Sequence, residues 1–494
     1  MVRRFLRDSA VYALPAALSR AISFLLFPLF AHHFSPTDYG VLDIVLLIGS
    51  LAAVTVALEI SQGLGRYVAA ERDPDVRREY ASTALLFTIA AYTAFVLVVE
   101  GAAAPITDVV LGPDVSPGLM RVAGAWMWVT GVLYLMQNQL RWELRPTPYA
   151  ISSGLMAAVT ALSSALFVLG LDMSVMGALL GQLLGAAAAL VFVLGVSHGS
   201  FDLRFDREKW HQMVHFSLPL VPSGLGVFLN AYADRLVIQH TRSLADVGVY
   251  GVGFRWAMIV SLALVGFQGA AMPLFLARYQ EPSTPADIAR IFRIFAALGL
   301  GSFVALSVLA PPALRILAAA PYQRASHVVA LLVLSSLFAG MYMFAPGLAI
   351  AKEMGTMAKV TVVAGIANLV LAIALVPPFG IVGAGVATAA TSLWWFGSLM
   401  RASQHHYPVP HRWGSLAAAL ASGVALVGAS MAVLPSGRAD ALDPAGLVAR
   451  AFFVVGGIGV TTYLALGAVE SRRLIGAVLG VVRRVGPQPR GSRP

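Results

Sequence analysis

The chain has 494 residues, of which 58% are hydrophobic and only 12% are charged, and its formal net charge is +10. Soluble proteins carry about 25% charged residues, so this composition excludes an ordinary soluble domain and indicates a surface that mostly faces lipid. The sequence contains no cysteine, which excludes disulfides, thiol catalysis and cysteine metal sites. Membrane proteins concentrate Lys and Arg in their cytoplasmic loops, so the positive charge calls for no nucleic-acid partner.

The first apolar stretch, 11–33, predicts a helix of about 35 Å, at about 1.5 Å per residue, which is long enough to cross a bilayer. Pro15 and Pro28 lie inside it and predict kinks, because each removes a backbone hydrogen bond. Arg20 also lies inside it, where a charge is costly and usually functional. The basic start of the chain resembles a signal peptide, but this stretch is too long for one and carries Arg20, so we predict an uncleaved first span.

Apolar runs along the rest of the chain bring the predicted number of membrane spans to fourteen. They lie near 11–33, 40–61, 81–103, 118–140, 149–171, 175–196, 213–233, 247–271, 291–311, 327–350, 359–379, 381–401, 415–434 and 447–468. A tight turn is predicted between spans eleven and twelve, at Pro377-Pro378-Phe379-Gly380. With a cytoplasmic N-terminus, 25 of the 34 Lys and Arg residues fall on the inner side and 7 on the outer side, while Arg20 and Arg255 lie within spans. The sequence therefore predicts a multi-pass protein of the cell inner membrane with both termini in the cytoplasm.

Short motifs recur at a nearly constant offset of about 206 residues, which predicts an internal repeat. The matching pairs are Leu14-Pro15 with Leu218-Pro219, Asp38-Tyr39-Gly40-Val41 with Asp246-Val247-Gly248-Val249, Gln62-Gly63 with Gln268-Gly269, and Gly177-Ala178 with Gly383-Ala384. Each copy holds six spans, an even number, so the two copies should be related by an axis along the membrane normal. The predicted organisation is an N-terminal lobe at 1–206, a C-terminal lobe at 207–404, and two further spans with a basic tail at 405–494.

Several of these features resemble one family of membrane proteins. They are the kinked opening helix, the loop Ser35-Pro36-Thr37-Asp38-Tyr39-Gly40, the basic loop after the second span, and the Gly- and Ala-rich sixth and twelfth spans. The chain resembles the lipid-linked oligosaccharide flippases of the multidrug/oligosaccharidyl-lipid/polysaccharide exporter superfamily over essentially its whole length. The resemblance implies an all-α integral membrane fold with two pseudo-symmetric six-helix lobes around a central cavity plus two C-terminal helices. It also implies movement of an undecaprenyl-diphosphate-linked sugar unit from the cytoplasmic to the outer leaflet.

A diphosphate cargo requires cations within the membrane, and arginine binds phosphate oxygens through two parallel hydrogen bonds. Arg20 in the first span and Arg255 in the eighth are the best-placed cations, one in each lobe, and we expect them to grip the cargo from two sides. Structural ion pairs or snorkelling to an interface are the alternatives for both. Asp43 could pair with Arg20 or carry a coupling ion, and Asp43, Asp234 or water should face the arginines when the cavity is empty.

Further polar residues could contact the sugar. Asn230 and Asp234 share a face at the predicted outer end of span seven, where Asp234 and Arg235 could instead simply mark the end of the helix. Gln268 lies within span eight and could meet sugar hydroxyls or hydrogen-bond to another helix.

No constellation in the sequence supports an enzyme, a metal site or a cofactor. The histidine pairs 32–33 and 405–406 and His411 lie at span ends without acidic or ligand partners nearby in sequence. Four alternatives to the flippase remain open: a lipid II flippase, a multidrug exporter of the same superfamily, a sugar-chain polymerase, and a non-transporting subunit of a synthase complex. The polymerase would need a large catalytic outer loop, and the exporter would need an acid where span one has Arg20. The expected partners are a lipid-linked anionic glycan and membrane lipids, with a polysaccharide polymerase or export complex as a further partner to test.

Overall fold

The structure is a computed structural model, and it describes residues 26–471 except 203, 261–274, 435–441 and 469. All the secondary structure of these residues is helical. The helices are α2 (Pro36–Thr55), α3 (Ile60–Ala70), α4 (Pro74–Gly101), α5 (Ala103–Val110), α6 (Pro117–Trp142), α7 (Pro146–Ala165), α8 (Ser174–Val196), α9 (Arg207–Ser217), α10 (Val221–Thr241), α11 (Leu244–Ala257), α13 (Thr284–Leu317), α14 (Ser326–Gly340), α15 (Gly347–Ile350), α16 (Met354–His406), α17 (Trp413–Val433) and α18 (Pro444–Leu466).

Eleven of the described helical segments are long and apolar enough to cross a membrane. One of them, Met354–His406, contains two predicted spans, so the segments cover all the predicted ranges except 11–33 and 247–271. Those two ranges lie partly outside the described residues. The structure thus confirms the all-α membrane fold and agrees with a plan of about fourteen spans.

The loop that precedes the second span is a helix cap. The Ser35 hydroxyl accepts a hydrogen bond from the Asp38 backbone N–H at 3.1 Å, and the Asp38 carboxylate accepts one from the Ser35 backbone N–H at 3.3 Å. Pro36 occupies the first turn of α2, where its missing N–H costs nothing. The Ser-Pro-x-Asp motif is therefore a capping box that fixes where α2 begins.

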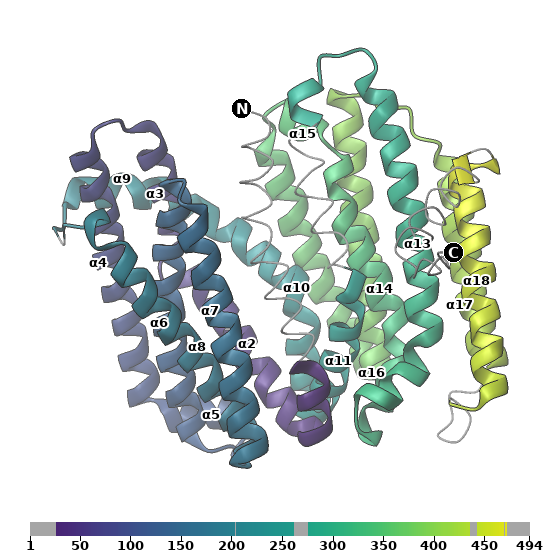
Figure 1. The fold of residues 1–494 in the computed structure, drawn as a ribbon, viewed down its shortest axis with the longest axis horizontal. Coiled ribbons are helices and arrows are strands. Elements are labelled where there is room, and N and C mark those ends of the chain that lie inside the picture. Colours follow the sequence, from purple (N-terminus) through teal and green to yellow (C-terminus); the bar gives the residue numbers. More distant parts are fainter. Residues whose placement is uncertain (1–25, 203, 261–274, 435–441, 469, 472–494) are drawn as a thin grey trace, which may run out of the picture.

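The helices form two bundles, which Figure 1 shows side by side. One bundle contains α4, α6, α7 and α8, and the other contains α10, α13, α14 and α16, with α17 and α18 at its outer edge. The ribbons approach each other at the end where α2 and α11 begin, which we call the junction end. They diverge toward the end that holds α3 and α15, which we call the loop end.

At the junction end, α2 packs directly on α11 through two glycines. A Cβ atom at Gly40 would lie 1.9 Å from the Leu244 carbonyl oxygen, and one at Gly248 would lie 2.0 Å from the Pro36 carbonyl oxygen. The two backbones can approach this closely because neither position carries a side chain. Gly40 and Gly248 occupy the same place in the two copies of the sequence repeat, offset by 208 residues.

Helix α16 contains the turn that was predicted between spans eleven and twelve. Gly380 has φ 58° and ψ −139°, a backbone conformation that favours glycine, directly after Pro377 and Pro378. The Arg242 guanidinium donates to the carbonyls of Val376 and Pro377. The usual helical partners of these carbonyls are the N–H groups of residues 380 and 381, which lie at and beyond the non-helical Gly380. The chain therefore reverses here rather than continuing as one straight helix.

Candidate functional site

One carboxylate joins the two bundles close to the junction end. Asp43 of α2 accepts a hydrogen bond from Arg235 Nε of α10 at 3.1 Å, and its other oxygen lies 3.2 Å from a terminal nitrogen of Arg255 of α11. Asp43 lies seven residues from the start of α2, about 10 Å along the helix at about 1.5 Å per residue. The carboxylate and its two cations therefore lie within the helical layer, the carboxylate in the predicted lobe 1–206 and the cations in the predicted lobe 207–404.

A second carboxylate, Asp234, also contacts Arg235 and completes the network. Its Oδ1 accepts from the Arg235 backbone N–H at 2.8 Å and lies 3.4 Å from the Arg235 side chain. Its Oδ2 accepts hydrogen bonds from the Tyr250 hydroxyl and, at 3.2 Å, from the Thr388 hydroxyl of α16. Asp234 is thus fully hydrogen-bonded, as a buried charge must be.

Aromatic rings enclose both arginines. The Arg255 guanidinium lies 4.6 Å from the centre of the Tyr39 ring, and the Arg235 guanidinium lies 4.3 Å from the centre of the Phe254 ring. Such stacking stabilises a cation where water is excluded. Gly251 makes room for the carboxylate, because a Cβ atom there would lie 2.6 Å from Asp43 Oδ2.

Arg235 and Arg255 differ in their exposure and in the number of partners that they contact. The Arg235 side chain is 4% exposed and contacts both carboxylates and the Ala231 carbonyl. The Arg255 side chain is 20% exposed, and its Nη1 is buried without a hydrogen-bond partner among the described residues. The network contains two arginines and two aspartates, which balance in charge, and one donor of Arg255 has no partner among the described residues.

The positions of the predicted site residues can now be stated. Asp43, Asp234, Arg235 and Arg255 lie in one network, and α10 continues to Thr241, so the prediction that span seven ends at 233 was wrong. Asn230 lies one turn away from Asp234, and its backbone carbonyl accepts a hydrogen bond from Asn368 at 3.2 Å. Arg20 and Gln268 lie outside the described residues.

Sequence reasoning did not single out Tyr39, Tyr250 or Thr388 as members of the network. Tyr39 and Tyr250 belong to the repeated motif regions, since each follows an aspartate by one or four residues, and this was the available signal. Thr388 lies in an Ala- and Gly-rich span with no pattern that marks it, and only the packing of α16 brings it to Asp234.

The network is an arrangement of ion pairs and hydrogen bonds. The described residues contain no group of three or more His, Asp or Glu side chains that could hold a metal ion. In the network each carboxylate is instead engaged by arginine or hydroxyl donors. An incoming anion with several oxygens could occupy the spare donor of Arg255 and compete with Asp43 for the rest of its fork.

Solved structures with a similar fold are membrane transporters. The lipid II flippase MurJ in an inward closed conformation matches with a TM-score of 0.71 and 11% sequence identity, covering 94% of this chain and 100% of that chain. An inward-facing multidrug resistance MATE transporter of the MOP superfamily matches with a TM-score of 0.62 and 16% identity, covering 83% and 95%. At these identities the likeness establishes the fold alone, and it agrees with the all-α membrane fold predicted from the sequence.

The family is established by sequence. A model of the family described as polysaccharide biosynthesis protein matches residues 5–280, more than half of the chain, so the chain belongs to that family. A curated relative, Lsg locus putative protein 1 of Haemophilus influenzae, is 29% identical over 75 residues. This match covers 15% of the chain and 19% of that relative's length, so it adds no detail about the activity.

Proposed function

We propose that this protein is a flippase that carries an undecaprenyl-diphosphate-linked oligosaccharide from the cytoplasmic to the outer leaflet for the synthesis of a cell-surface polysaccharide. The family and the transporter fold support this class of activity. The observation that carries the proposal is the network of Asp43, Asp234, Arg235 and Arg255, which we call the interlobe network. In it Arg255 pairs with Asp43 of the other predicted lobe, and one of its donors has no partner among the described residues. A diphosphate is the kind of anion that such a fork binds best.

The network also supports a route for alternating access. In this state Asp43 ties α2 to α10 and α11 at the junction end. A diphosphate that enters between the lobes takes over the fork of Arg255 and releases Asp43 from it. Because a cargo moves an equilibrium only by its differential affinity for two states, this exchange gives the cargo a direct means to loosen the junction. Arg20 of the first span would hold the same diphosphate from the opposite lobe.

The proposed orientation places the loop end in the cytoplasm and both chain termini on that side, in the inner membrane. The bias of Lys and Arg toward the loops of that side supports this orientation. In this orientation the contact between α2 and α11 at the junction end lies on the outer side.

The experiment that tests the function is cargo flipping by the purified protein in vesicles. Arg255→Ala removes both the charge and the phosphate hydrogen bonds and should abolish flipping, while Arg255→Lys keeps the charge without the fork and should retain partial activity. Arg121→Ala is the matched control, since Arg121 is an exposed arginine 3.6 Å from Glu100 outside the network. Full flipping by Arg255→Ala in protein of normal abundance would contradict the proposed role.

Lipid II is the second candidate cargo, and the structural similarity to MurJ over 94% of the chain favours it over a cationic drug. Both cargoes share the polyprenyl diphosphate, so the network does not discriminate between them. Parallel vesicle assays with lipid II and with an undecaprenyl-diphosphate oligosaccharide decide this point, because the proposal requires faster flipping of the oligosaccharide.

A further inference from the structure

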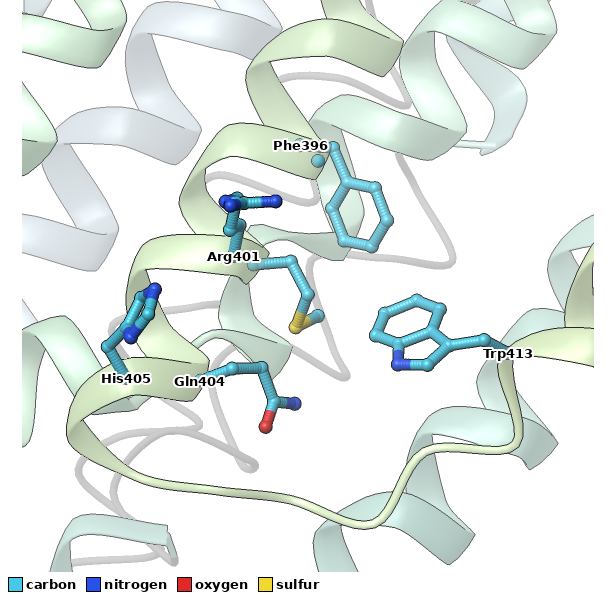
Figure 2. A pocket seen from close by; sticks show the side chains of 7 residues that line it. Phe396, Arg401, Gln404, His405 and Trp413 are labelled. Carbon is cyan, nitrogen blue, oxygen red and sulfur yellow. The ribbon is translucent and has the colours of Figure 1, made fainter.

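A cavity of about 610 Å³ lies at the loop end, away from the interlobe network, between the last turns of α16 and the first residue of α17 (Figure 2). Its existence follows from the packing of the two helices. Helix α17 packs on α13 and α18 rather than on α16, although it follows α16 directly in sequence. The chain between them, 407–412, therefore runs along one side of a space that no described helix fills.

The two walls of this cavity differ in chemistry. Phe396, Met400 and Trp413 supply apolar surface, while Arg401 and His405 lie one turn apart on the same exposed face of α16. Neither Arg401 nor His405 makes a hydrogen bond or ion pair with another described residue, and no described carboxylate lines the cavity. The cavity thus offers a cation and an imidazole beside an apolar wall, with no anion to satisfy them.

One polar residue of the lining already forms hydrogen bonds within the protein. Gln404 donates to the Val409 carbonyl at 3.2 Å and accepts from the Val409 backbone N–H at 2.9 Å. Both ends of its amide are therefore used to hold the segment that closes the cavity. This leaves Arg401 and His405 as the groups that are available to a ligand.

An exposed apolar stripe leads from the cavity along α16 toward the middle of the membrane. Val386 is 40% exposed and Leu393 is 47% exposed, and both lie on the face that continues through Gly397 to Arg401. A Cβ atom at Gly397 would meet nothing within 4 Å, so the stripe is open at the point where it enters the cavity. In a membrane helix such an exposed apolar face contacts acyl chains.

We propose that this cavity binds the headgroup of an anionic phospholipid, with its acyl chain along the stripe of α16. Arg401 donates to the phosphate oxygens and His405 hydrogen-bonds beside it, while Trp413 provides the aromatic wall that is typical of the membrane–water interface. The bound lipid bridges α16 and α17 and so ties the α17–α18 pair to the C-terminal bundle where the protein itself leaves a space. The proposal rests on the membrane fold and is independent of the cargo.

The test measures lipid binding by the purified full-length protein with native mass spectrometry. Phosphatidylglycerol should bind more tightly than phosphatidylcholine, whose choline brings a positive charge to a cavity that has no carboxylate. Arg401→Gln should weaken the affinity for phosphatidylglycerol about fivefold, because a basic residue near an anionic surface contributes about 1 kcal/mol. Gly397→Leu should block binding by filling the entrance, and inorganic phosphate alone should bind more weakly than the lipid, since it lacks the acyl contacts.

Lys359→Gln is the matched control, because it removes one positive charge from an exposed residue near the start of α16, outside the cavity. It should leave the affinity unchanged. Equal binding of the two lipids, equal affinity of inorganic phosphate, or unchanged binding in both Arg401→Gln and Gly397→Leu would each overturn the proposal. Displacement of phosphatidylglycerol by a polyprenyl diphosphate at equal concentration would also overturn it and assign the cavity to the cargo. Arg401→Gln is an exposed change, so it gives an answer even if Gly397→Leu does not fold.

Discussion

Two arginines hold pairs of helices together in opposite ways. Arg255 joins α11 to α2 at the junction end through a charged partner, Asp43. Arg450 of α18 instead donates to the backbone carbonyl of Val308 in α13 at 3.0 Å. That carbonyl would otherwise lack a partner, because Pro312 four residues later has no N–H to give it.

The difference shows which contact can be exchanged. A carboxylate can be replaced by a phosphate anion on the same guanidinium, whereas a phosphate has no way to replace a backbone carbonyl without exposing it. The rest of the α13–α18 contact is apolar and close, since a Cβ atom at Gly457 would lie 2.6 Å from a methyl group of Val304. We infer that α2 and α11 can separate at the junction end, whereas α13 and α18 stay in contact.

The largest expected effect comes from removing the shared carboxylate. Asp43→Ala leaves Arg235 and Arg255 buried together without the anion between them, and breaking a buried ion pair from one side costs about 3–5 kcal/mol. We expect a lower melting temperature in detergent and a junction that opens more often. Opening can be measured with the pair Ala31→Cys and Ala319→Cys, whose backbones are hydrogen-bonded at 2.9 Å, because the chain has no native cysteine.

Asp114→Ala is the control for this experiment, since it removes an exposed carboxylate outside the network. The Asp43→Ala protein should form the disulfide more slowly than the control does. Equal rates of crosslinking and equal melting temperatures would show that the charges do not hold the junction closed.

A second prediction concerns the glycines that bring α2 and α11 together. Gly40→Ala places a methyl group where the Leu244 carbonyl lies, so the two helices must separate and the Arg255–Asp43 pair must lengthen. The disulfide between Ala31→Cys and Ala319→Cys should therefore form more slowly, and the rate of flipping in vesicles should fall severalfold. Gly428→Ala in α17 is the matched control, because its added methyl group meets nothing within 4 Å. A Gly40→Ala protein that crosslinks like the control would exclude close backbone packing as the basis of closure.

The sequence predicted the class of fold well, because span length, charge bias and the repeat are properties of the chain alone. It also placed Asp43 and Arg255 within spans, where a charge requires a partner. Which partners meet depends on packing between residues about two hundred positions apart, so the Asp43–Arg235 contact could not be read from spacing. The charged pair Asp234-Arg235 lowered the local hydropathy and made span seven end at 233, whereas α10 continues to Thr241.

The third prediction tests the contact between α13 and α18. Arg450→Met keeps most of the side-chain volume and removes the hydrogen bond to Val308, leaving a carbonyl that Pro312 cannot satisfy. The melting temperature should fall, by an amount that corresponds to about 1–3 kcal/mol for a lost buried partner. The crosslink at the junction end should not change, because the two contacts lie in different parts of the molecule. A change in that crosslink would show that the two contacts are coupled.

The smallest expected effect is a pH dependence of stability that arises in the segment between α16 and α17. His411 lies in the segment between α16 and α17, against the rings of Phe292 and Trp413, both at 4.9 Å between ring centres. Burial first, and then the nearby Arg293 guanidinium, lower the pKa of His411 from 6.5 to about 4. Between about pH 4 and pH 6.5, His411 is therefore protonated in the unfolded chain but stays neutral in the folded protein. The stabilising effect of the neutral ring is complete above about pH 6.5 and is lost as the pH falls toward 4.

Replacing the ring isolates this contribution. His411→Phe keeps an aromatic side chain against Phe292 and Trp413 but cannot be protonated, so its melting temperature should change less between pH 6.5 and 4 than that of the wild type. His198→Phe is the control, since His198 is an exposed histidine in another loop. Parallel curves for the His411→Phe and wild-type proteins would mean that the segment tolerates the charge. A flatter curve for His411→Phe would show that this segment is kept neutral, in contrast to the junction end, which is held together by charged partners.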